Sequence, residues 1–216
     1  MSPPGGAPLR EAIEPLPRGR HNLSRDDVRE SQRARLIRAM LDCVAEQGYP
    51  ATTVADVVAA ARCSRNAFYE LFEDKEACYI AASDQTGAEM LDALVSAAER
   101  EESWLDALRS GTRSYLQWWV DNPNYAAAYL IHLPAAGQRA LEQRDRVYAD
   151  FAAMFEGLGT RARAEQPLLA ALPPLAPRML VMAITELVAQ EVRNGRTDKL
   201  PELEDMLVRF VVKALT

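Results

Sequence analysis

The chain has 216 residues, of which 49% are hydrophobic and 7% aromatic, and its formal net charge is −6. This composition excludes a wholly disordered chain, because it supplies enough apolar surface for a packed core. No apolar run reaches the ~20 residues of a transmembrane helix and the N-terminus lacks an apolar signal core, so the sequence predicts a cytoplasmic protein that does not bind membranes.

The first predicted element is a basic arm. Residues 1–17 are rich in Pro and Gly, and we expect residues 1–24 as a whole to be disordered. The stretch from Arg18 to Arg38 holds seven arginines against three acidic residues, a net charge of +4. Positive charge concentrated in this way attracts phosphates even on an acidic protein. Basic arms of DNA-binding proteins also reach into the minor groove, which makes Arg18 and Arg20 candidate DNA contacts.

Residues 25–82 predict a helix-turn-helix domain. The apolar spacing and the breaks predict four helices, at about residues 25–47, 54–60, 65–72 and 75–102. Each predicted helix follows a residue type that caps helix N-termini; these residues are Ser24, Thr53, Ser64 and Asp74, with Asp27 and Asp56 completing the first two capping boxes. Gly48 is expected to end the first helix in the left-handed conformation. A tight turn separates the short second and third helices, and a helix-turn-helix presents its second helix to the DNA major groove in this way.

Residues 83–216 predict a larger helical domain. Its helices are expected at about residues 103–121, 124–134, 138–165, 177–194 and 201–215, with Pro, Gly and Asn at the breaks. No segment shows the period-2 alternation of a strand. The sequence therefore predicts an all-α fold of about nine helices, with an N-terminal helix-turn-helix domain and a larger C-terminal helical domain.

One stretch of the N-terminal domain is specific enough to suggest a family. The pattern S-R-x-x-F-Y-x-x-F-x-x-K runs from Ser64 to Lys75, and Gly48-Tyr49, Thr52-Thr53-Val54 and the apolar pair Val57 and Val58 precede it. These residues resemble the TetR family of bacterial transcriptional regulators over about residues 30–80. The resemblance implies a repressor that a small-molecule ligand releases from a palindromic double-stranded DNA operator, with residues 83–216 sensing the ligand and forming a homodimer.

The predicted third helix carries the main candidate DNA contacts. Arg65 and Asn66 begin it, and these side chains can bind two atoms of guanine and of adenine, respectively. By the resemblance, Tyr69 and Lys75 contact DNA phosphates. Lys75 begins the fourth helix, where a cation opposes the helix dipole, and this also points to a role outside the helix.

Further candidate contacts lie at helix starts and in the turn. Thr52, Thr53 and Ser64 either only cap helices or also lie against phosphate. The chain has Arg62 where the family often has Gly, so either this residue accepts backbone strain or the turn differs slightly, and its cation can contact DNA. Glu70 also departs from the family pattern, which has neutral or basic residues there more often.

Aromatic and Met side chains are concentrated in the C-terminal domain. Such side chains line adaptable apolar cavities, although an ordinary helical core has the same composition. Following the resemblance, we interpret them as a cavity for an unknown apolar or aromatic effector, with His132 and Glu186 as its polar groups. The candidate lining residues are Met90, Trp104, Tyr115, Trp118, Trp119, Tyr125, Tyr129, His132, Phe151, Met154, Met182 and Glu186.

The two predicted C-terminal helices are apolar enough to need a partner. By the resemblance, they pair with the same helices of a second copy in an isologous interface. The candidate interface residues are Leu180, Leu187, Leu203, Leu207, Phe210 and Val211.

Two other classes of function are weighed against this interpretation. A small all-α enzyme or carrier could use the aromatic cavity, but the sequence shows no nucleophile–base pair, no phosphate-binding glycine loop and no metal-ligand spacing among its three cysteines and two histidines. We therefore expect neither an enzyme nor a cofactor. A non-specific architectural DNA binder would need far more positive charge than a net −6.

Overall fold

The computed structural model describes residues 24–215, and within them the fold is all-α, as predicted. Nine α-helices and no strand are found in this part of the chain. The α-helices are α1 (Arg25–Gln47), α2 (Val54–Ala60), α3 (Arg65–Leu71), α4 (Lys75–Glu99), α5 (Trp104–Asp121), α6 (Pro123–Ala126), α7 (Gln138–Glu165), α8 (Ala176–Arg193) and α9 (Glu204–Leu215). A π-helix, η1 (Ala127–His132), and two 3₁₀ helices, η2 (Leu133–Ala136) and η3 (Thr197–Leu203), complete the list.

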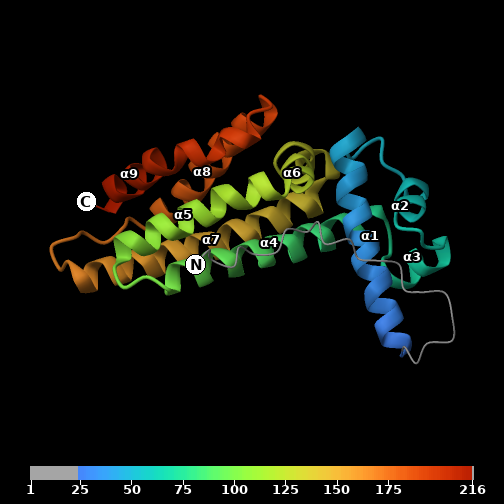
Figure 1. The fold of residues 1–216 in the computed structure, drawn as a ribbon, viewed down its shortest axis with the longest axis horizontal. Coiled ribbons are helices and arrows are strands. Elements are labelled where there is room, and N and C mark those ends of the chain that lie inside the picture. Colours follow the sequence, from blue (N-terminus) through green and yellow to red (C-terminus); the bar gives the residue numbers. More distant parts are fainter. Residues whose placement is uncertain (1–23, 216) are drawn as a thin grey trace, which may run out of the picture.

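The helices form a small unit at one end and a long bundle (Figure 1). The helix α1 stands across the end of the bundle of α4, α5 and α7, and α2 and α3 lie on the outer side of α1. The helices α8 and α9 lie along the bundle, α8 against α7 and α9 against α5. None of the described helices is long and apolar enough to cross a membrane.

The predicted caps position the helices of the small unit. The Ser24 hydroxyl accepts from the Asp27 N–H at 3.0 Å, and the Asp27 carboxylate accepts from the Ser24 N–H in return. Thr53 and Asp56 form the same capping box at the start of α2. Ser64 and Asp74 cap α3 and α4, so the predicted boundaries of these helices are confirmed to within a few residues. These contacts satisfy N–H groups that a helix start leaves without partners.

The structure differs from the sequence prediction at three places. Residues 124–134 are not one α-helix but α6 followed by η1 and η2, and the Ala128 carbonyl of η1 accepts a 2.6 Å hydrogen bond from the buried Tyr79 hydroxyl. Residues 201–203 belong to the 3₁₀ helix η3, and α9 begins at Glu204. Gly48 has the expected positive φ of 81°, but its ψ of 156° lies outside the left-handed helical region.

A single buried cluster joins the small unit to the bundle. It includes Leu36 and Met40 of α1, Tyr79 of α4 and Trp119 of α5, all nearly inaccessible to solvent. The helix α4 therefore belongs to both units, since it begins beside α3 and continues into the bundle (Figure 1). The helix-turn-helix and the bundle therefore share one packed core.

Candidate nucleic-acid interface and apolar cavity

The loop that enters α2 is closed by internal hydrogen bonds. Thr52 is buried, and its hydroxyl donates to the Gly48 carbonyl at 2.9 Å. The Thr53 hydroxyl is exposed and donates to the Asp56 carboxylate at 2.7 Å. These bonds with Thr53 hold the pKa of Asp56 below its ordinary value. Both threonines therefore build the start of α2, and Thr53 also lies at its surface.

In the turn between α2 and α3, Arg62 has a positive φ at the position where the family often has Gly. Arg62 has a φ of 52°, and among the described residues no other non-glycine residue has a positive φ. Its side chain is exposed, immediately before the segment that caps α3. The predicted strain at this position is confirmed, because the left-handed conformation crowds a Cβ atom against the following carbonyl.

The helix α3 has one buried and one exposed face. Phe68 is inaccessible to solvent and its ring lies 5.6 Å from that of Phe72, which is also buried. Arg65, Asn66 and Tyr69 are exposed, and Tyr69 keeps 58% of its surface accessible while its ring packs edge-on against Phe68. The core thus fixes the helix by its aromatic face and leaves the polar groups available to another molecule.

Most polar side chains of this exposed face have no partner among residues 24–215. In the part of the chain that the structure describes, no hydrogen bond or ion pair engages the side chains of Arg62, Arg65, Asn66 or Tyr69. The Ser64 hydroxyl, by contrast, accepts from the Ala67 N–H at 3.0 Å, which is its capping role. We name the exposed side chains of Arg62, Ser64, Arg65, Asn66 and Tyr69 the α3 surface.

Lys75 lies in a different environment from the α3 surface. Its Nζ donates to the carbonyl oxygens of Tyr49 and Thr52, both at 2.9 Å, and lies 4.1 Å from the centre of the Tyr49 ring. Partial burial lowers the pKa of Lys75, and burial raises the pKa of Tyr49 to about 12. Two of the three N–H donors of the ammonium group are therefore used to hold the loop that precedes α2.

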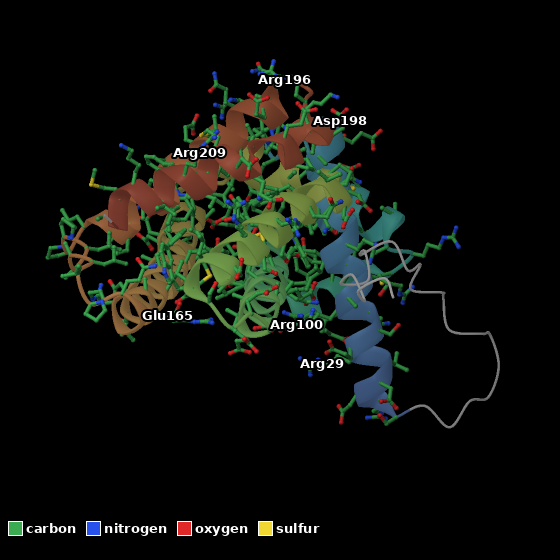
Figure 2. The ribbon with its side chains drawn as sticks, turned by 60° about the vertical axis from the view of Figure 1, so that its left-hand side comes forward. Arg29, Arg100, Glu165, Arg196, Asp198 and Arg209 are labelled. Carbon is green, nitrogen blue, oxygen red and sulfur yellow. The ribbon has the colours of Figure 1, made fainter. Side chains whose placement is uncertain are left out.

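The predicted basic stretch lies only partly within the described residues. Arg18 and Arg20 lie outside the described residues. The described part of the basic stretch begins at Arg25, and Arg29, labelled in Figure 2, extends from an early turn of α1. Farther along α1, Arg33 donates to Gln85 of α4 at 2.9 Å, so this arginine is part of the junction with the bundle.

An apolar cavity of ≈330 Å³ lies in the half of the bundle that is distant from α3. It is lined by α4, α5, α7 and α8, with Leu207 of α9, and its volume is within the range of small-molecule sites. Its polar groups include Thr112, Tyr115 and Thr185, and Glu99 and Arg161 line it where α4 and α7 approach their ends. Arg161 binds the Glu101 carbonyl and Glu165, which Figure 2 labels at the end of α7.

Three of the predicted lining residues lie at this cavity: Tyr115, Phe151 and Met154. The others lie elsewhere. Trp119, Tyr125 and Tyr129 pack on one another, with the Trp119 and Tyr125 rings stacked 5.4 Å apart, and Tyr125 also lines a second crevice of ≈150 Å³ beside α1. Met90 and Trp104 are buried, Trp118 is partly buried and His132 contacts the Gly48 turn, all outside the cavity wall.

Met182 and Glu186 are also absent from the cavity wall, because both are exposed on α8, and Glu186 pairs with Arg193. The sequence interpretation did not identify most of the aliphatic wall, which includes Leu94, Leu108 and Leu158, nor did it identify Arg161. Leucines at helical spacing have the same pattern in a packed core and in a cavity wall, so no sequence signal separates the two.

The predicted dimer residues divide into two groups. Leu180, Leu207 and Val211 are buried within the protomer and Leu187 and Leu203 are partly buried. Phe210 keeps 45% of its surface exposed. Three methionines of the same two helices, Met179, Met182 and Met206, are exposed as well. Figure 2 shows Arg209, the neighbour of Phe210, on the outer side of α9.

The comparisons with known proteins agree with the helix-turn-helix geometry. The model of the family described as bacterial regulatory proteins, tetR family, matches residues 36–82. No curated protein matches the chain. The fold is similar to that of a fatty acid degradation regulator, FadR, from Bacillus halodurans, with a TM-score of 0.74 and 17% identity over 84% of this chain and 98% of that one.

Two further solved structures show the same similarity. FadR from Bacillus subtilis in complex with stearoyl-CoA has a TM-score of 0.75 and 14% identity over 84% of this chain and 98% of that one. A TetR family transcription regulator from Marinobacter aquaeolei VT8 has a TM-score of 0.68 and 19% identity over 88% of this chain and 98% of that one.

The described residues form an all-α fold in which a helix-turn-helix exposes the polar side chains of the α3 surface. Residues 36–82 match the model of the tetR family of bacterial regulatory proteins, and 84–88% of the chain has the fold of these solved transcriptional regulators. The resemblance seen in the sequence is thereby confirmed.

Proposed function

We propose that this protein is a homodimeric repressor that binds a palindromic operator and is released from it by an apolar small molecule. The observation that carries the DNA-binding part is the α3 surface, where every polar side chain except that of the capping Ser64 lacks a partner within the described residues. Phe68 and Phe72 anchor the helix from its buried side. Arg65 and Asn66 are the base-reading residues of this proposal, because they stand at the start of α3.

Selection from a randomised pool of double-stranded DNA at physiological salt tests this function. Two half-sites related by two-fold symmetry are expected, with centres about one helical turn, ~34 Å, apart. The variant carrying Arg65→Ala and Asn66→Ala serves as the matched control, because both side chains are exposed and their loss leaves the core intact. Retention of DNA without any sequence preference would contradict a specific regulator.

The homodimer is supported by the exposed apolar residues of α8 and α9. Met182 and Phe210 keep 50% and 45% of their surfaces exposed, and large apolar side chains on a surface mark interaction sites when they lie together. Met182→Glu is expected to lower the mass measured by light scattering to that of one chain. Leu105→Glu, at an exposed apolar residue of α5, is the control and should leave the mass unchanged. A monomeric wild-type protein at micromolar concentration would refute the homodimer.

The effector is proposed to be a molecule with a long apolar chain. Most residues that line the cavity are aliphatic or aromatic, and its charged residues Glu99 and Arg161 lie toward one end of the bundle. The structural similarity to a FadR crystallised with stearoyl-CoA supports this class of ligand. Fatty acids and acyl-CoA thioesters of graded chain length are the probes, with the melting temperature and the release of selected DNA as readouts.

A variant that fills the cavity separates specific binding from adsorption. Gly111 lines the cavity, and a Cβ atom there would meet its nearest neighbour, the Leu94 carbonyl oxygen, at 3.9 Å, so a Cβ atom fits at this position. Gly111→Leu is expected to abolish the ligand-induced rise in melting temperature. Ala153→Leu, on the exposed face of α7, should preserve it. Equal responses of the two variants would show that the ligand binds elsewhere.

A further inference from the structure

The helix α2 ends in a hydrogen-bonded motif that normally contains glycine. The Arg62 N–H donates to the Ala59 carbonyl at 3.1 Å, and the Cys63 N–H donates to the Val58 carbonyl at 2.9 Å. This pair of bonds is a Schellman motif, in which the residue after the helix cap adopts the left-handed conformation. Arg62 occupies that position with a φ of 52°, so an interaction that stabilises the turn would offset a strain that glycine does not have.

A side chain of α1 supplies such an interaction. The Arg35 Nη1 group donates to the Ala61 carbonyl at 3.1 Å and lies 3.5 Å from the Arg62 carbonyl. These two carbonyls belong to the cap residue and to the left-handed residue itself. Arg35 therefore binds the backbone of the turn from the side of α1.

The charge of Arg35 has no acidic partner that would explain its position. Among residues 24–215, no carboxylate lies within ion-pair distance of its guanidinium. The guanidinium also lies close enough to the Cys63 thiol to oppose the rise that burial causes in the pKa of that thiol. The contacts of Arg35 thus converge on the turn, where the last carbonyls of α2 carry partial negative charge.

We propose that Arg35 is a positioning residue, which holds the turn between α2 and α3 in the left-handed conformation and so presents Arg62 and the start of α3 to DNA. It fixes the direction of the chain at Arg62, two residues before the Ser64 cap of α3. The effect on DNA rests on the proposed function, whereas the hold on the turn is a property of the folded protein alone.

A double-mutant cycle with Arg35→Met and Arg62→Gly tests this role without DNA. Hydrogen exchange is measured by mass spectrometry on the full chain, in peptides that cover residues 58–68. Arg35→Met should speed exchange at the turn about tenfold when Arg62 is present, and less than about threefold in the Arg62→Gly background, because glycine adopts the conformation without strain. Arg29→Met, on an exposed part of α1, is the control and should leave exchange at the turn unchanged.

Two results overturn the proposal. Equal effects of Arg35→Met in the two backgrounds would show that Arg35 supports the fold generally, and no effect in either would show that the contact is not used. Should Arg35→Met fail to fold, Arg35→Gln replaces it in the same cycle, since its amide retains N–H donors at a shorter reach.

The DNA readout is kept separate from this cycle. On DNA selected by the wild-type protein, Arg35→Met is expected to weaken binding about tenfold, and Arg35→Lys, which preserves the charge, is not expected to restore it fully. If the wild-type protein selects DNA but Arg35→Met changes hydrogen exchange equally in the two backgrounds, the role of Arg35 is refuted and the proposed function stands. Failure of the wild-type protein to select any DNA would refute the proposed function, and the exchange cycle would still decide the role of Arg35.

Discussion

Replacing Lys75 by Met tests whether this lysine stabilises the loop before α2 or binds a DNA phosphate. Met keeps most of the apolar stem but removes the ammonium group, which donates two 2.9 Å hydrogen bonds to the Tyr49 and Thr52 carbonyls. Hydrogen bonds from a charged donor contribute about 1.5–3 kcal/mol each, and the contact over the Tyr49 ring adds roughly 0.5–1 kcal/mol. The two bonds share one ammonium group and part of their energy offsets its desolvation, so the net loss in stability is expected to be about 2–3 kcal/mol.

Urea unfolding monitored by circular dichroism, at one fixed protein concentration because oligomers dissociate on dilution, measures this loss. Tyr69→Phe is the matched control, since the Tyr69 hydroxyl lies on the exposed face of α3. The salt dependence of DNA binding completes the comparison. A stability change below about 0.5 kcal/mol, together with a salt slope reduced by about 0.9, would refute the loop-holding role and identify Lys75 as a phosphate ligand.

Three other predictions concern the interface and the core. Arg65→Ala should weaken binding by about 1–3 kcal/mol at one base position of the selected DNA, whereas Tyr69→Phe should weaken binding to all sequences alike. Affinities for every single-base variant of the selected DNA distinguish the two effects. A uniform loss of affinity for Arg65→Ala would exclude base reading by Arg65. Hydrogen bonds with the capping threonine hold the pKa of Asp56 below its ordinary 3.8, so its stabilisation is complete above that value and is lost as pH falls through the lower folded-state pKa. Acid titrations of wild type and Asp56→Asn should therefore converge at the lowest pH, and parallel curves would contradict the capping box. Cys78 is inaccessible and burial raises its pKa to about 12, so iodoacetamide at neutral pH should not label it until the protein unfolds. Rapid labelling of the native protein, detected by mass spectrometry, would contradict the packing of α4 on α1.

The accuracy of the sequence interpretation follows the range of the interactions involved. The start of α2 depends on Thr53 and Asp56, which are three residues apart, and the exposed and buried faces of α3 depend on Phe68 and its neighbours within one turn. The strain at Arg62 follows from the geometry of a single residue. Such features are local, so their physics is already present in a short stretch of sequence.

The cavity could not be placed in the same way. The aromatic residues from Trp118 to Tyr129 were interpreted as its wall, yet Trp119 and Tyr125 stack on each other and fill space instead of lining it. Whether a ring packs or lines a cavity depends on the distances between helices that are far apart in sequence. The same limit applies to α6 and η1, where a hydrogen bond from Tyr79, far away in the chain, accompanies a departure from the α-helix.

The sequence by itself determined the all-α fold, the helix caps and the helix-turn-helix with its similarity to the tetR family, because these depend on spacing and on residue chemistry within a few turns of helix. Tertiary structure alone decided that the cavity lies among α4, α5, α7 and α8, and which apolar side chains of α8 and α9 remain exposed. It also decided the contacts of Lys75 and Arg35, which bind backbone carbonyls more than twenty residues away. A carbonyl group is present at every residue, so no pattern of side chains in the sequence reveals which one a distant cation will bind.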